Sequence, residues 1–220
     1  MVEIASHNYS EARLQNEVLQ SKPRGGSKAG KSGSFRMENS RKTGQELFIC
    51  TYNTRTIRTE ESLQHLLEEL EEFKWDIIGL AETRREGEGL EEIEGGAWLY
   101  NRGATEDDKK ARGVGFLIHS KIKDNIIEVK SYSNRVILLR LQLAGKEEMC
   151  IIQVYAPTSD HDDDEVEQFY EDITKALEEH KSNYTIVMGD FNAKVGKQQE
   201  GEENILGKFG VGERNRRVRP

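Results

Sequence analysis

Residues 185–196, TIVMGDFNAKVG, decide how the rest of the chain is interpreted. The β-branched and apolar start of this stretch predicts a buried strand, and Gly189 marks the end of that strand. Asp190 and Asn192 follow at once, although packing of the strand does not require them. Open α/β sheets carry their functional groups at the carboxyl ends of strands, so we expect both side chains to face a site. A plain turn is the alternative, since Asp and Asn also satisfy loop backbone groups.

The composition indicates one α/β domain with a strongly polar surface. The 220 residues are 35% hydrophobic and 33% charged, which allows one sizeable core but not two. No apolar run approaches the roughly 18 residues of a membrane helix. The amino terminus also lacks the apolar segment of a secretory signal. We therefore expect an intracellular protein without membrane contact, and a nuclear location is compatible with this expectation.

The charge is unevenly distributed along the chain. The formal net charge is −8, but residues 1–46 contain 8 Lys/Arg and 5 Asp/Glu, so the remaining residues carry −11. Gly, Ser, Lys and Arg dominate residues 21–44, and we predict a disordered basic tail over residues 1–46. A body this acidic binds nucleic acid only through a local basic patch or bound cations.

Two further patterns in the sequence are not expected to form binding sites. Residues 25–32 match the phosphate-loop pattern G-x-x-x-x-G-K-[ST], but no buried strand precedes them and no helix follows. We therefore predict no nucleotide cofactor. Cys50 and Cys150 each lie inside an apolar strand-like run, which is typical of buried free thiols rather than of a disulfide or a zinc site.

From residue 47 the pattern becomes that of a folded α/β domain, which we expect over residues 47–220. The run LFICTYN predicts a strand at 47–53, and DIIGLAE predicts another at 76–82. Between them Thr59 is the expected N-cap of a helix. Its inward residues at helical spacing are Leu63, Leu66, Leu67, Leu70 and Phe73. Strand, helix and strand at this distance predict two parallel strands.

The middle of the chain is rich in strands and contains a second helix. Strands are expected at 97–103, 112–119, 125–132, 135–143 and 148–158. An amphipathic helix is expected at about 163–179, followed by the strand of the opening stretch. The inward residues of that helix are Val166, Phe169, Tyr170, Ile173, Ala176 and Leu177.

Three of the predicted strands end in polar side chains. Asn53 ends the first, Glu82 the second, and Asp190 with Asn192 the last. If these strands are parallel neighbours, all four side chains meet at one edge of the sheet. Glutamate oxygen is a typical Mg²⁺ ligand, and an aspartate beside it could orient or deprotonate a water molecule. Such a site suits a phosphate ester. Tyr155, just before the strand-ending Pro157, could place its phenol against that phosphate.

At this point the motifs resemble a known family. The order TYNTRT, GLAETRR, RGVGFLI, VYAPT, MGDFNAKVG and GERN, from about residue 47 to residue 215, resembles the endonuclease/exonuclease/phosphatase superfamily. The closest likeness is to the endonuclease domain of non-LTR retrotransposons and the craniofacial development protein 2-like sequences related to them. The resemblance implies a DNase I-like four-layer α/β sandwich. It also implies nicking of DNA phosphodiesters with Mg²⁺, or with Mn²⁺ as an alternative cofactor.

The resemblance assigns a role to each matching residue. It implies that Glu82 is the metal ligand, with Asn53 beside it at the metal and the phosphate. Tyr155 is implied to stabilise the pentacovalent phosphate. Asp190 is implied to activate the attacking water, with Asn192 next to it. Arg135 matches a substrate-binding position of the family less firmly. An exposed arginine at the start of a strand, without a role in binding, is an equally good interpretation of this residue.

The family pattern continues beyond GERN with further strands and ends in a Ser-Asp-His motif. We therefore expect the C-terminal strands and the terminal Asp-His pair to be absent here, which would leave activity weak or lost. The tripeptide Ser159-Asp160-His161 does occur, but ahead of an acidic helix start. We interpret it as a loop in which Asp160 or a neighbour caps that helix.

Two alternatives to an active endonuclease stay open. One is a catalytically dead domain that binds nucleic acid or another partner through its basic tail and the terminal RNRRVR. The other is a phosphatase or phospholipid-cleaving relative within the same superfamily. The TYNTRT and GERN segments argue against this second alternative through their resemblance to the endonucleases.

Overall fold

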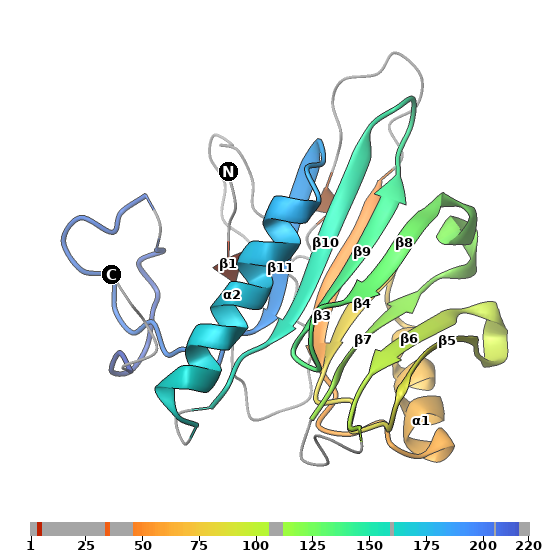
Figure 1. The fold of residues 1–220 in the computed structure, drawn as a ribbon, viewed down its shortest axis with the longest axis horizontal. Coiled ribbons are helices and arrows are strands. Elements are labelled where there is room, and N and C mark those ends of the chain that lie inside the picture. The colour runs from red at the N-terminus through yellow and green to blue at the C-terminus, as the bar shows by residue number, and fades with distance from the viewer. Residues whose placement is uncertain are drawn as a thin grey trace.

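Two β-sheets packed face to face form the centre of the molecule in this computed structural model (Figure 1). The structure describes residues 4–5, 34–35, 46–105, 112–158, 161–204 and 206–215. Within these residues, one sheet has five strands in the order β1 (Ile4–Ala5), β11 (Tyr184–Asp190), β10 (Glu148–Tyr155), β9 (Val136–Gln142) and β8 (Ile126–Ser131). The other has six, in the order β2 (Ser34–Phe35), β3 (Leu47–Asn53), β4 (Ile77–Ala81), β7 (Val114–Ile118), β6 (Trp98–Arg102) and β5 (Glu88–Glu92).

The predicted strand–helix–strand unit is confirmed. Strands β3 and β4 pair in parallel, and helix α1 (Glu60–Leu70) connects them. Thr59 caps α1 as predicted, because its hydroxyl accepts a hydrogen bond from the Ser62 N–H at 3.2 Å. Helix α1 ends before Phe73, which is 49% exposed, so the inward position predicted for Phe73 is wrong.

Helix α2 (Asp163–Glu179) matches its predicted range. Asp162 caps it by accepting a hydrogen bond from the Glu165 N–H at 2.9 Å, so the cap comes from a neighbour of Asp160 as expected. Ser159 and Asp160 lie outside the described residues. Tyr170 was expected to face inward but is 39% exposed, because Phe169 fills the buried face and Tyr170 packs against its edge.

Three apolar clusters divide the molecule into four layers. The largest cluster lies between the two sheets and includes Ile49, Ile77 and Ile151. On the far side of the six-stranded sheet, a second cluster joins Cys50 and Ile78 to α1. On the far side of the five-stranded sheet, a third joins strands β9, β10 and β11 to α2. Two sheets flanked by helices on opposite sides of the molecule agree with the DNase I-like sandwich, and both cysteines are buried and free as predicted (Figure 1).

The expectation that the three polar-ended strands are parallel neighbours in one sheet is wrong. Strands β3 and β4 are neighbours, but β11 pairs in parallel with β10 in the other sheet. The strand ends still meet, because the two sheets stack with the carboxyl ends of these four strands at the same end of the inter-sheet layer. The site therefore forms between two sheets rather than along one edge.

One buried polar side chain crosses the inter-sheet layer. Gln153 on β10 is fully buried, and its Oε1 accepts a hydrogen bond from the Thr51 hydroxyl on β3 at 3.2 Å. The Gln153 amide occupies the space where a side chain at Gly79 would lie. Gln153 therefore fixes the position of β10 against β3 and β4.

Strand β5 was not predicted, because its sequence EGLEE is exposed at every position and has no apolar alternation. Strands β1 and β2 fall within the predicted basic tail, but most of that segment lies outside the described residues, as do residues 25–32 of the phosphate-loop pattern. The predicted disorder of residues 1–46 thus stays a prediction. Among the residues that the structure describes, no helix is long and apolar enough to cross a membrane.

Candidate active site

Asp190 ends β11 on its inner face, where it is 6% exposed. Its Oδ1 accepts a hydrogen bond from the Asn192 N–H at 2.9 Å. The preceding Gly189 has φ +140°, and a Cβ there would collide with the Val154 backbone of the neighbouring strand. The glycine of the MGD motif is therefore required by the close approach of β10 and β11, and Asp190 is fixed by backbone geometry.

Asn192 is held in an unusual conformation by neighbours from two segments. Its φ is +48°, in the left-handed region that few non-glycine residues adopt. The Asn192 Nδ2 donates to the Ala156 carbonyl at 2.7 Å, and the Asn192 carbonyl accepts from Asn215 Nδ2 at 3.2 Å. Asn215 also accepts from the Lys194 N–H at 3.1 Å and donates its own N–H to the Lys194 carbonyl at 3.0 Å. The GERN segment thus supports the loop after β11.

Glu82 follows β4 with φ +56° and carries a largely buried side chain. Glu82 Oε2 forms ion pairs with Arg112 Nη1 at 2.7 Å and Arg84 Nη2 at 3.2 Å. The loop backbone is fixed from the side of β7, because the Arg84 N–H donates to the Arg112 carbonyl at 2.7 Å. Thr83, which is fully buried, donates its hydroxyl to Asn101 at 2.7 Å. Glu82 is therefore held by charged side chains on a well-anchored loop.

Asn53 joins the two carboxylates. Its Nδ2 lies 3.0 Å from Glu82 Oε1 and 3.4 Å from Asp190 Oδ2, while its Oδ1 accepts the Arg55 N–H at 3.0 Å. Asn53 is exposed, so the amide faces the open end of the inter-sheet layer. The structure thus brings together Asn53, Glu82 and Asp190, but across two sheets rather than at the one sheet edge that was expected.

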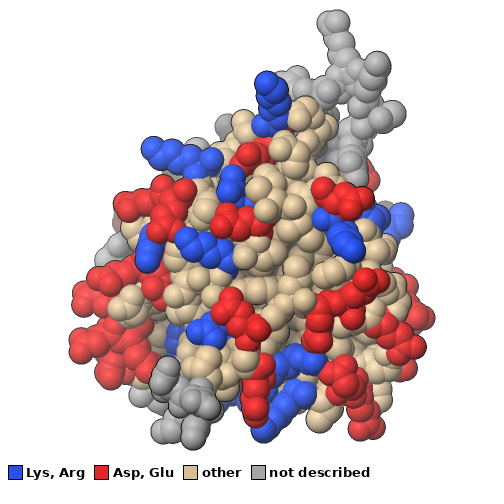
Figure 2. Space-filling view, turned by 45° about the vertical axis from the view of Figure 1, so that its right-hand side comes forward, with Lys and Arg blue, Asp and Glu red and all other residues tan. Residues whose placement is uncertain are grey.

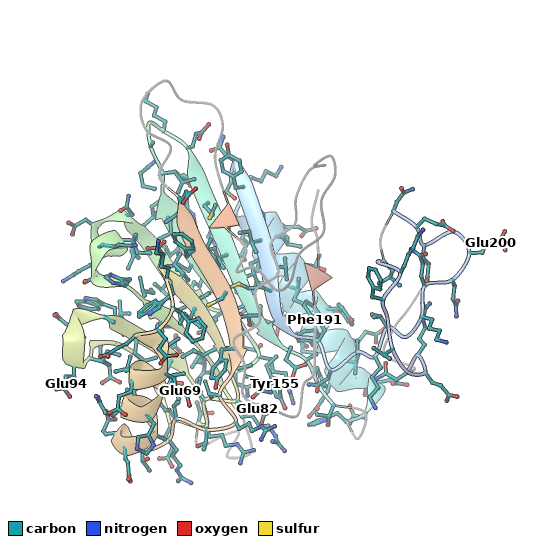
Figure 3. All side chains as sticks on the ribbon, turned by 180° about the vertical axis from the view of Figure 1, so that it is seen from behind. Glu69, Glu82, Glu94, Tyr155, Phe191 and Glu200 are labelled. Carbon is teal, nitrogen blue, oxygen red and sulfur yellow. The ribbon has the colours of Figure 1, made fainter. Side chains whose placement is uncertain are left out.

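Tyr155 and Arg135 lie next to this group. Tyr155 is 2% exposed at the end of β10, and Figure 3 shows it beside Glu82 at the same end of the sheets. The Arg135 guanidinium lies 5.8 Å from the centre of the Tyr155 ring and forms an ion pair with Glu165 at 3.6 Å. Arg135 therefore packs on the Tyr155 ring, and its guanidinium also donates to the Tyr155 carbonyl at 3.5 Å.

The two carboxylates have opposite electrostatic environments. Burial raises the pKa of Asp190, the Glu82 charge raises it further, and the Asn192 N–H only partly offsets this. Burial would also raise the pKa of Glu82, but hydrogen bonds from Asn53, Arg112 and Arg84 outweigh it and lower that pKa. Burial, and then the negative charge of Glu82, raises the pKa of Tyr155, which keeps the phenol protonated. Two acids with pKa values pushed apart are typical of sites that divide acid and base roles.

The sequence analysis missed three residues of this site: Arg84, Arg112 and Asn215. Arg112 carries no periodic signal, but it lies two residues before strand β7, whose start pairs with the end of β4 at Val114 and Ala81. That antiparallel pairing is the signal that could have placed Arg112 beside Glu82. Asn215 lies in the quoted GERN motif but was given no role.

The described residues contain no group of three or more His, Cys, Asp and Glu side chains arranged to hold a metal ion. Mg²⁺, however, binds through one or two carboxylates and keeps several waters. The carboxylates of Glu82 and Asp190, bridged by the amide nitrogen of Asn53, offer oxygen donors of this kind. The donor set fits a hard divalent cation that completes its coordination with water and substrate phosphate.

The surface around the site has mixed charge. On the face shown in Figure 2, acidic and basic side chains are interspersed. At the site itself Arg55, Arg84 and Arg112 are exposed. The Arg84 and Arg112 guanidinium groups provide local positive charge beside Glu82.

Comparisons with known proteins relate the chain to one protein family. The sequence profile of the Endonuclease/Exonuclease/phosphatase family matches residues 50–198. Craniofacial development protein 2 from Bos taurus is 33% identical and that from Tragulus javanicus 32% identical, each over 173 residues, which is 78% of this chain. A solved structure of humanised D. rerio TDP2 with 14 mutations aligns with a TM-score of 0.46 at 11% identity, over 74% of this chain and 67% of that one.

The chain therefore belongs to the Endonuclease/Exonuclease/phosphatase family. The aligned region covers 28% and 29% of the two craniofacial development proteins, so the chain spans less than a third of the length of these relatives. The predicted resemblance to the family and to craniofacial development protein 2 is confirmed.

Proposed function

We propose that this chain is a metal-dependent phosphodiesterase domain that nicks DNA. The observation that carries this proposal is the pair of carboxylates from different sheets, Glu82 and Asp190, bridged by the single amide of Asn53. A phosphodiester needs a cation on one side and a base for the attacking water on the other. The opposite directions of the two pKa shifts support this division of roles.

Each residue has a proposed task at the phosphate. Bound at Glu82, Mg²⁺ or Mn²⁺ would polarise a phosphoryl oxygen and stabilise the charge that develops on the leaving oxygen. Asp190 accepts the proton of the attacking water, which requires its ionised form, and Asn192 holds Asp190 through the backbone N–H. Tyr155 stays protonated and donates its hydroxyl to the phosphate, and Arg135 holds the Tyr155 ring from behind.

DNA is the proposed substrate for electrostatic reasons as well as by family. The exposed arginines at the site and the Lys- and Arg-rich residues 1–46 provide the local positive charge that a polyanion needs beside an otherwise acidic body. A nicking activity of the retrotransposon type and an intracellular, nuclear location belong to the same proposal.

A plasmid-nicking assay tests the function. Supercoiled plasmid is incubated with the chain and Mg²⁺ or Mn²⁺, and conversion to the open circle is followed with and without EDTA. We expect nicking that EDTA stops and that Asp190→Ala abolishes. The control variant Glu94→Ala, at an exposed turn outside the site, should retain nicking. Plasmid binding without nicking would instead support a catalytically dead nucleic-acid-binding module. Preferential cleavage of phosphomonoesters or phospholipids would support the phosphatase or phospholipid-cleaving alternative.

A further inference from the structure

The carboxylate of Glu82 is fully engaged by side chains of the chain itself. Oε1 accepts from Asn53, and Oε2 accepts from both Arg112 at 2.7 Å and Arg84 at 3.2 Å. A cation that approaches Glu82 through Oε2 therefore meets two guanidinium groups on that oxygen. Metal and arginine compete for the same atom.

The two sides of these ion pairs differ in their freedom to move. The Glu82 side chain is 14% exposed, whereas the Arg112 and Arg84 side chains are 48% and 47% exposed. The backbone beneath all three is fixed by the hydrogen bonds from Arg84 N–H to Arg112 and from Thr83 N–H to Gly113 at 3.3 Å. The arginines can thus rotate into solvent while the carboxylate keeps its place.

The displaced arginines would remain where an anion is expected. Arg112 lies close enough to Tyr155 that the two influence each other's pKa, and Tyr155 lies beside Asp190 in the same way. A guanidinium released from Glu82 keeps its full set of donors, which suits the oxygens of a phosphodiester.

We propose that Arg112 and Arg84 act as an internal counter-ion that occupies the metal-binding carboxylate of Glu82 until a phosphodiester and a divalent cation replace it together. This inference rests on the proposed function only in placing the cation at Glu82. It makes the binding of metal and the binding of phosphate mutually favourable, because the phosphate draws the guanidinium groups away from the carboxylate.

Metal affinity in the absence of DNA tests the proposal. Mn²⁺ is titrated into the full chain by calorimetry, and free Mn²⁺ is counted by electron paramagnetic resonance. We expect Arg112→Gln to bind Mn²⁺ about fivefold more tightly than the wild type, and the double variant with Arg84→Gln to bind more tightly still. The matched control is Arg58→Gln, since Arg58 forms an exposed ion pair with Glu86 at 2.9 Å, and its affinity should equal that of the wild type.

Glu82→Gln locates the effect at the carboxylate. Combined with Glu82→Gln, the Arg112→Gln substitution should no longer tighten Mn²⁺ binding. Equal or weaker binding by Arg112→Gln, or no measurable binding by the double arginine variant, would overturn the proposal. Because no nucleic acid is present, a failure to nick plasmid would not change this readout.

Dimethyl phosphate tests the coupling to an anion. We expect this diester to tighten Mn²⁺ binding by the wild type and to have no such effect on the double arginine variant. Equal tightening in both proteins would show that the arginines do not transmit the coupling, and would overturn that part of the proposal.

Discussion

The two carboxylates of the site are held in place by different means. Asp190 is buried at the end of a strand, and backbone groups fix it through Gly189 and Asn192. Glu82 lies on a loop, and the partly exposed side chains of Arg112 and Arg84 pair with its carboxylate. A group fixed by backbone suits a role that depends on exact position, whereas a group held by exchangeable charges suits the capture of an ion. The pKa of the first is raised and that of the second is lowered, in line with this division.

The largest expected difference between Asp190 and Glu82 is in how their variants affect activity. If Asp190 is the base, Asp190→Asn should lower kcat for plasmid nicking by about 10³-fold, and added Mn²⁺ should not restore it. Glu82→Gln should instead weaken metal binding, so that excess Mn²⁺ recovers much of the lost rate. Nicking rates across a Mn²⁺ titration distinguish the two variants. Recovery of Asp190→Asn by metal would reverse the proposed roles.

The next effect concerns the backbone that supports Asp190. Gly189→Ala should lower the free energy of unfolding by about 3 kcal/mol or more, since the added Cβ meets the Val154 backbone and φ +140° strains any side chain. The control is Gly89→Ala on β5, where the Cβ has open space and no positive φ. Urea denaturation measures both. Similar stability of the two variants would mean that β10 and β11 can move apart without cost.

A smaller effect is expected from the segment behind Asn192. Asn215→Ala removes the hydrogen bonds to Asn192 and Lys194, and should lower kcat about tenfold while leaving Mn²⁺ affinity unchanged. Asn183→Ala is a matched control, because Asn183 likewise accepts a backbone N–H, that of Glu148, at the opposite end of β10. The two variants should lose similar stability, and only Asn215→Ala should lose activity. An equal loss of activity in both would mean that Asn215 acts through stability alone.

The smallest expected effects are on stability, and they have opposite signs. The folded pKa of Asp190 is raised above 3.8, so the wild type loses stability as pH rises from 3.8 through the folded pKa. Asp190→Asn has no such loss. The variant should therefore be the more stable protein at pH 7. The folded pKa of Glu82 is lowered below 4.5, so its contribution is complete above pH 4.5 and is lost as pH falls through the folded value. Glu82→Gln should therefore be the less stable at pH 7. Unfolding free energies from pH 3 to 7 would contradict the contrast if both differences had the same sign.

Much of the site could be predicted from the sequence because its residues break a local pattern. Asn53, Glu82 and Asp190 each follow an apolar strand, and that interruption is visible without the structure. The placement of β11 in a second sheet could not be predicted, since strand pairing depends on contacts between residues far apart in the chain. Arg112 was missed for the same reason, because only the pairing of β4 with β7 brings it to Glu82.

Gln153 has a consequence for how the two halves of the site stay aligned. Thr51 and Gln153, which contact each other between the sheets, lie two residues before Asn53 and Tyr155 on the same faces of β3 and β10. If one sheet moved past the other by a single residue, about 3.3 Å, the Gln153 amide oxygen would lie in an apolar layer without the Thr51 hydroxyl that it accepts from. The same movement would also lengthen the 3.4 Å separation of the Asn53 and Asp190 side chains. The buried Gln153 amide therefore helps to keep Glu82 and Asp190, which lie on different sheets, within reach of one phosphate.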